Sequence, residues 1–109
     1  VGLIDDAAFA AAWVTSRHRG RGLARRVLGL ELRRKGVAPE TIDQALELID
    51  HDDERERATA LVHNKLPRMH HLETEVVIRR LVGQLSRKGY SSALAYSVVR
   101  EALDSVDVS

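Results

Sequence analysis

The sequence of 109 residues has no cysteine, two prolines and few aromatic residues, which make up 4% of the chain. The lack of cysteine excludes disulfide frameworks and thiolate metal sites, and it is typical of proteins from a reducing compartment. No apolar run approaches the roughly 18 residues that a membrane-spanning helix needs, and no signal peptide is visible. We therefore expect a cytoplasmic protein that has no contact with a membrane.

The chain carries almost no net charge, at +1, but its charges are unevenly distributed. Eight basic residues lie between Arg17 and Lys35 and are opposed by Glu31 alone, whereas acidic residues gather between Asp50 and Glu56. The net charge therefore says little about partners, but the asymmetry predicts one basic face.

A basic phrase that contains a glycine occurs twice. Residues 31–37 read ELRRKGV, and residues 84–90 read QLSRKGY. In each phrase, basic residues fill the last turn of an expected helix, where cations complement exposed carbonyl groups. Gly36 and Gly89 can close these helices in the left-handed conformation. The two glycines are 89 − 36 = 53 residues apart, which predicts two copies of one helical unit.

Apolar residues at helical spacing predict three helices in each unit and no strand. The expected breaks are an arginine-rich turn at 17–22, the Gly36 turn, the acidic residues near 50–53, a linker from 67 to about 74, and the Gly89 turn. Residues 105–109 are expected to form a fraying tail. Short apolar stripes need a second unit to bury them, so the predicted fold is all-α, with tandem three-helix units at residues 1–50 and 51–109.

Two aromatic residues of the first expected helix have two interpretations. Phe9 and Trp13 could stack on bases, or they could pack in the core. Because they lie at helical spacing with Ala12 and Ser16, we predict that this face packs in the core.

Candidate sites for metal ions and for catalysis are weak. His51 lies beside acidic residues, and His63, His70 and His71 lie near Glu73, but neither group has the ligand spacing of a structural metal site. The serines fall in expected caps or helix faces without a base and an orienting partner. We therefore expect no metal, no cofactor and no enzyme activity.

The chain resembles a known family over nearly its whole length. The similarity is carried by the string GLIDDAAFA at residues 2–10, the arginine-rich turn with Gly20 and Gly22, LRRKGV at residues 32–37 and RKGYS at residues 87–91. In this order, these residues resemble the bacterial RecX family.

The resemblance implies tandem three-helix repeats related to helix-turn-helix units, and a regulator of the RecA recombinase in DNA repair and the SOS response. Such proteins bind in the groove of RecA filaments on single-stranded DNA, restrain recombinase, ATPase and coprotease activity, and also bind DNA. They usually carry another repeat before the GLIDD string. The resemblance therefore implies that this chain corresponds to the two C-terminal repeats.

Twelve basic residues form the candidate site for the RecA filament or for DNA. They are Arg17, Arg19, Arg21, Arg25, Arg26, Arg33, Arg34, Lys35, Arg79, Arg80, Arg87 and Lys88. Guanidinium groups suit phosphate oxygens and carboxylates, which are both abundant on a nucleoprotein filament. The 53-residue shift relates Arg26 to Arg79, Arg34 to Arg87 and Lys35 to Lys88.

Two other functions stay open beside the RecA regulator. The chain could be a sequence-nonspecific, helix-turn-helix-like DNA-binding module, in which case its binding should fall steeply with salt. It could also be a structural interaction domain whose basic face serves only solubility. The repeated basic residues could then reflect the preference of helix C-termini for cations.

Overall fold

The computed structural model describes residues 5–107 of the chain, and the backbone in that range forms helices and no strand. The elements are α1 (Asp6–Arg21), α2 (Arg25–Arg34), α3 (Pro39–Leu46), α4 (His51–Lys65), the short 3-10 helix η1 (Leu66–Met69), α5 (Thr74–Arg87) and α6 (Ser92–Asp107). The predicted all-α class is confirmed. Residues 1–4, which include the start of the GLIDD string, lie outside the described range.

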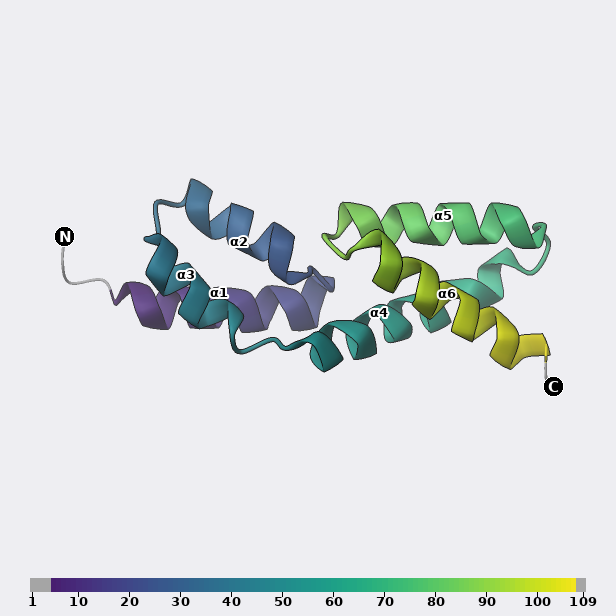
Figure 1. The fold of residues 1–109 in the computed structure, drawn as a ribbon, viewed down its shortest axis with the longest axis horizontal. Coiled ribbons are helices and arrows are strands. Elements are labelled where there is room, and N and C mark those ends of the chain that lie inside the picture. The colour runs from purple at the N-terminus through teal and green to yellow at the C-terminus, as the bar shows by residue number, and fades with distance from the viewer. Residues whose placement is uncertain (1–4, 108–109) are drawn as a thin grey trace.

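The molecule is a rod that measures 55 × 21 × 21 Å along its principal axes. Helices α1 to α3 form one end and α4 to α6 form the other (Figure 1). In this view, α2 and α5 lie along the same long edge of the rod. The predicted pair of three-helix units is therefore present, and the repeated helices α2 and α5 share a side of the molecule. Within residues 5–107, no helix is long and apolar enough to cross a membrane.

Each unit has its own apolar core. The first core contains Ala10, Val14, Leu23, Leu28, Leu32, Val37, Ile42, Ala45 and Ile49. The second core contains Ala58, Val62, Val77, Leu81, Leu85, Tyr90, Leu94, Ala95, Val98, Val99 and Ala102, together with Ala24 from the first unit. Because Ala24 is fully buried among residues of the second unit, the units share packing at the start of α2. A boundary at residues 50 and 51 stays a prediction.

Local signals in the sequence explain where several helices begin and end. Asp5 caps α1, and its side chain accepts a hydrogen bond from the backbone N–H of Ala8 at 3.1 Å. Asp50 and Asp53 form a reciprocal capping box at the start of α4. Gly36 and Gly89 have φ angles of 84° and 104°, so the left-handed conformation predicted for both is confirmed.

The predicted turn at residues 17–22 is wrong for most of its length. Helix α1 continues to Arg21 and ends at Gly22, whose φ angle is 69°. Arginine is a good helix former, so a single glycine at position 20 does not end the helix. Gly22 closes it in the left-handed conformation, where its N–H donates to the carbonyl of His18 at 3.0 Å. The predicted tail is also shorter than expected, because α6 includes residues 105–107.

The predicted apolar face of α1 is wrong as well. Ala10 and Val14 are its buried residues, whereas Phe9 is 38% exposed. Trp13 is half-buried and packs against the first core. The buried residues of α4 are Ala58 and Val62, which lie 48 positions after Ala10 and Val14. Equivalent positions of α1 and α4 therefore differ by 48 residues, whereas the two glycines Gly36 and Gly89 differ by 53.

Candidate functional site

Most of the exposed arginines lie on the two repeated helices α2 and α5. Leu28 and Leu32 face the core from α2, and Leu81 and Leu85 face it from α5. The other faces of these helices carry arginines that are all exposed. We call this set the basic surface; its members are Arg25, Arg26, Arg33, Arg34, Arg79, Arg80 and Arg87.

The acidic residues of α2 and α5 do not neutralise the basic surface. Glu31 of α2 accepts a hydrogen bond from Nε1 of Trp13 at 2.9 Å, so its carboxylate serves the packing of α1 on α2. Glu75 lies in the first turn of α5, where its charge complements the helix N-terminus. Other acidic residues lie on α3, α4 and α6. Among them, Glu54 of α4 reaches the start of α2, where its carboxylate accepts a hydrogen bond from the backbone N–H of Arg25 at 3.0 Å.

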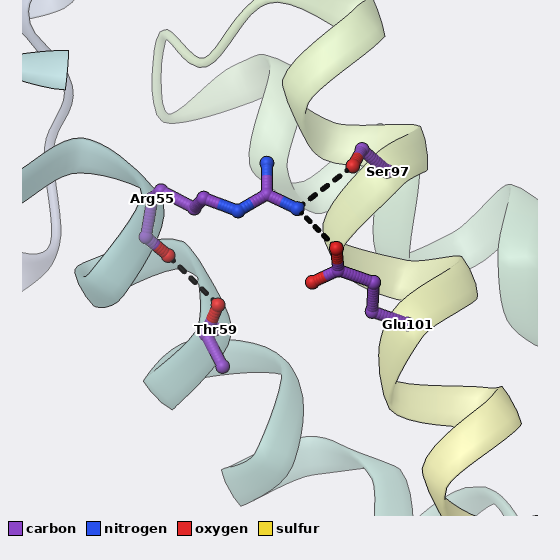
Figure 2. Close-up of polar contacts among 4 residues, drawn as sticks. All are labelled: Arg55, Thr59, Ser97 and Glu101. Carbon is purple, nitrogen blue, oxygen red and sulfur yellow. Dashed lines mark hydrogen bonds and ion pairs between the residues drawn. The ribbon is translucent and has the colours of Figure 1, made fainter. Parts of the chain in front are cut away.

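Among the described residues, the ion pair that the structure contains joins Arg55 to Glu101 at 2.6 Å, and none of the twelve predicted cations takes part in it. Figure 2 shows the Arg55 guanidinium of α4 reaching Ser97 and Glu101 of α6. Thr59 donates to the backbone carbonyl of Arg55 at 2.8 Å. Arg55 therefore holds two helices of the second unit together, while the basic surface stays available to a partner.

The predicted cations at the end of α1 have different surroundings. Arg19 and Arg21 are exposed. The guanidinium carbon of Arg17 lies 3.8 Å from the centre of the Trp13 ring, and Nζ of Lys35 lies 4.5 Å from it. Cations over the face of a tryptophan are attracted by its ring electrons. Lys35 at the end of α2 therefore helps to hold α1 against α2, whereas the contact of Arg17 with Trp13 lies within α1.

Two predicted cations bind main-chain carbonyls across the two units. Nζ of Lys88 donates to the carbonyl of Arg21 at 2.8 Å, and Nη2 of Arg26 donates to the carbonyl of Ser86 at 3.3 Å. Desolvation lowers the pKa of Lys88, and the nearby charges of Arg21 and other cations lower it further. Lys88 is half-buried, whereas Arg26, a member of the basic surface, stays exposed although it donates to the carbonyl of Ser86.

Two residues that organise this region, Arg57 and Tyr90, are absent from the predicted site. Arg57 donates from Nε to the carbonyl of His18 and from Nη2 to that of Arg19, both at 3.1 Å. The hydroxyl of Tyr90 donates to the carbonyl of Gly22 at 2.8 Å. One signal was present: Tyr90 lies 53 residues after Val37, so a hydroxyl stands where the first unit has an apolar side chain.

One further concave site among the described residues carries charges of both signs. A groove of about 380 Å³ lies where α1 meets the α3–α4 connection and α4, and it carries both signs of charge through Arg19 and Glu56. His70 binds the carbonyl of Pro67 through Nδ1 at 2.9 Å, which gives this histidine a structural role. Within residues 5–107, no group of three or more histidine, aspartate or glutamate residues is placed to hold a metal ion.

Comparisons with known proteins identify relatives of this arrangement. Residues 5–46 match the family model described as RecX, second three-helix domain. The protein named Regulatory protein RecX from Streptomyces coelicolor is 54% identical over 104 residues, which are 95% of this chain and 55% of the relative. The protein of the same name from Thermobifida fusca is 49% identical over 108 residues, which are 99% of this chain and 58% of that relative.

Two solved structures have a similar fold. The crystal structure of RecX from Lactobacillus salivarius aligns with a TM-score of 0.81 over 92% of this chain and 65% of that chain, at 22% identity. A crystal structure titled regulatory protein RecX aligns with a TM-score of 0.79 over 91% of this chain and 48% of that chain, at 26% identity. The chain spans little more than half the length of the curated relatives described above.

Proposed function

Because the chain belongs to the RecX family, we propose that it binds RecA filaments on single-stranded DNA through the basic surface and restrains their activity. The restrained activities are the recombinase, ATPase and coprotease activities, in DNA repair and the SOS response. The chain acts in the cytoplasm as a non-enzymatic regulator, without a cofactor. The observation that supports this proposal most is the set of exposed, unneutralised arginines on both repeated helices.

The chemistry of the basic surface suits an anionic assembly. A guanidinium group presents planar donors that match phosphate oxygens and carboxylates in pairs. Two pairs of surface arginines occupy equivalent places in the repeats, Arg26 with Arg79 and Arg34 with Arg87, and Arg33 adds to the first unit. Repeated cations along a 55 Å rod fit a partner that repeats its own negative charges. Arg19 and Arg21 extend this positive region to the end of α1.

Restraint of the filament follows from binding to more than one subunit at a time. A rod that bridges neighbouring subunits opposes the relative motions that ATP turnover or subunit addition require. Complementary charge speeds the encounter, and apolar and hydrogen-bonded contacts set the lifetime of the complex.

A second candidate function is sequence-nonspecific binding to DNA by the helix-turn-helix-like units. The exposed arginines of α2 and α5 favour it too, because phosphate contacts from arginine carry no sequence information. Such binding falls steeply as salt rises, since each contact releases condensed counterions. The two functions differ in whether RecA is needed.

Cosedimentation separates these functions. The chain is spun with RecA, with single-stranded DNA, and with both, at two salt concentrations, and its effect on RecA ATP hydrolysis is measured in parallel. Our proposal predicts preferential pelleting with the RecA–DNA filament and slower hydrolysis at saturation. Equal pelleting with bare DNA would favour the second function, and absence of both binding and inhibition would contradict the first.

A further inference from the structure

The two units meet at the C-terminal end of α1, and the second unit binds the carbonyl groups of that end. Helix C-termini leave carbonyls without intrahelical partners, and the helix dipole makes this end negative. Arg57 reaches the carbonyls of His18 and Arg19, while Lys88 and Tyr90 reach those of residues 21 and 22. Two cations and a phenol thus satisfy four carbonyls across the junction.

The backbone contacts at this junction are close on both sides. A Cβ atom added to Gly22 would lie 2.9 Å from Cδ1 of Leu61 in α4. A Cβ atom added to Gly89 would lie 2.8 Å from Cγ2 of Val27 in α2. The N–H of Ala24 donates to the carbonyl of Lys88 at 2.8 Å. Each unit therefore presents a glycine at the place where its backbone meets the other unit.

The first unit lacks two of the three side chains that the second unit uses here, since Lys35 is the equivalent of Lys88. By the 48-residue shift of the buried positions, Arg57 corresponds to Phe9. By the 53-residue shift of the glycines, Tyr90 corresponds to Val37. The position of Cβ at Gly36 has nothing within 4 Å, unlike that at Gly89. Arg57 and Tyr90 are thus particular to this junction and are not required to build a three-helix unit.

We propose that Arg57, Lys88 and Tyr90 form a clasp that holds the two units as one rigid body and fixes the basic surfaces of α2 and α5 in register. The two cores are separate except for Ala24, so polar contacts have a large share in setting the angle between the units. A change of angle at the middle of a 55 Å rod displaces its ends relative to each other. The consequence for filament binding rests on the proposed function, whereas the rigidity does not.

A distance measurement on the free 109-residue chain tests the clasp. Because the chain has no cysteine, spin labels can be attached to Asp43→Cys in α3 and Glu75→Cys in α5, which are both exposed. Electron–electron double resonance then measures the distribution of distances between the units. The parent chain should give one narrow distribution, and the clasp variant Arg57→Met/Tyr90→Phe should give a clearly broader one.

Arg55→Met/Tyr96→Phe is the matched control, with the same residue types changed on α4 and in the α6 region. Arg55 bonds within the second unit, and Tyr96 is 51% exposed, so neither residue contacts the first unit in the way that the clasp does. The control should keep the narrow distribution. An equally narrow distribution for the clasp variant would overturn the proposal. Loss of helical circular dichroism in that variant would overturn it too, because each unit is expected to keep its own fold.

Binding to RecA–DNA filaments tests the consequence separately. When α2 and α5 lose their fixed relative position, binding of one unit no longer places the other unit against the filament. We therefore expect the clasp variant to bind RecA–DNA filaments roughly tenfold more weakly in cosedimentation. Broad distances with unchanged binding would refute the link between the clasp and filament binding. If the parent chain shows a narrow distribution but no filament binding, the proposed function fails while the rigid clasp stands.

Discussion

At the scale of single residues, Tyr90 has a role that the equivalent residue of the first unit, Val37, does not have. Its ring is 2% exposed in the second core, and its hydroxyl reaches the carbonyl of Gly22 in the first unit. Burial raises the pKa of Tyr90 to about 12, with nearby Arg57 lowering it and Glu54 raising it by smaller amounts. The phenol therefore stays a hydrogen-bond donor at neutral pH.

The Tyr90→Phe variant tests this hydrogen bond. Loss of the hydroxyl leaves the Gly22 carbonyl without its donor, which should lower the free energy of unfolding by about 1–3 kcal/mol at pH 7. Urea denaturation followed by circular dichroism measures the change. Tyr96→Phe is the control, since Tyr96 is exposed, and it should change stability by less than about 0.5 kcal/mol. Equal effects of the two variants would contradict the structural role of Tyr90.

The pH dependence of stability gives an independent test of Tyr90. Its phenol loses a proton near pH 10 in the unfolded state and near pH 12 in the folded state, so the folded state holds more protons between these values. Stability should therefore fall by about 2 kcal/mol from pH 10 to pH 12. The pKa of Lys88 is lowered in the folded state, so this residue makes stability rise with pH near the ordinary pKa of a lysine. The difference between the pH profiles of stability of the parent chain and of Tyr90→Phe gives the contribution of the tyrosine. Identical profiles would contradict the raised pKa of Tyr90.

At the scale of helices, the sequence predicted α2 and α5 better than α1 and α4. Leucines and valines recur at helical spacing in α2 and α5, and each helix buries one such face, through Leu28 and Leu32 in α2 and through Leu81 and Leu85 in α5. Helix α1 has alanine at positions 7, 8 and 10–12, so it offers little contrast between faces, and the apolar face was placed on the wrong side.

The two left-handed glycines allow a matched test at the same scale. Gly36→Ala and Gly89→Ala both place an alanine at a positive φ angle, which costs about 1–2 kcal/mol. At Gly89 the new methyl group also meets Val27, including its backbone nitrogen at 3.0 Å, whereas at Gly36 the space is open. Gly89→Ala should therefore be less stable than Gly36→Ala by about 1–3 kcal/mol in thermal or urea denaturation. Equal losses would indicate that the units do not approach each other at Gly89.

At the scale of the whole molecule, the sequence predicted the two units and the basic asymmetry, but it did not predict their junction. The helical repeat was visible because equivalent residues recur 53 positions apart. The junction depends on side chains that bind main-chain carbonyls 38 to 68 positions away, and such contacts leave no periodic pattern. Arg57 lies in an acidic segment of the sequence, so the charge pattern also concealed its contact with α1.

The predicted cations differ in whether they contact other groups of the chain or lie exposed on α2 and α5. Arg17, Lys35 and Lys88 have contacts within the chain, with Trp13 or with the carbonyl of Arg21. The arginines of the basic surface are exposed on α2 and α5, although Arg26 among them also donates to the carbonyl of Ser86. We therefore expect charge reversal on the basic surface to change binding, and reversal of the internal cations to change stability as well.

The most direct test of a binding surface on α2 and α5 is the binding of two charge-reversal variants to RecA filaments on single-stranded DNA. Arg33→Glu/Arg80→Glu alters one exposed arginine on each repeated helix, and Arg68→Glu/Arg100→Glu makes the same change in net charge at exposed sites on η1 and α6. We predict that the first variant loses about tenfold or more in affinity and shows a shallower salt dependence, while the second loses less than about threefold. Equal losses in two variants with intact helical content would contradict a binding surface on α2 and α5.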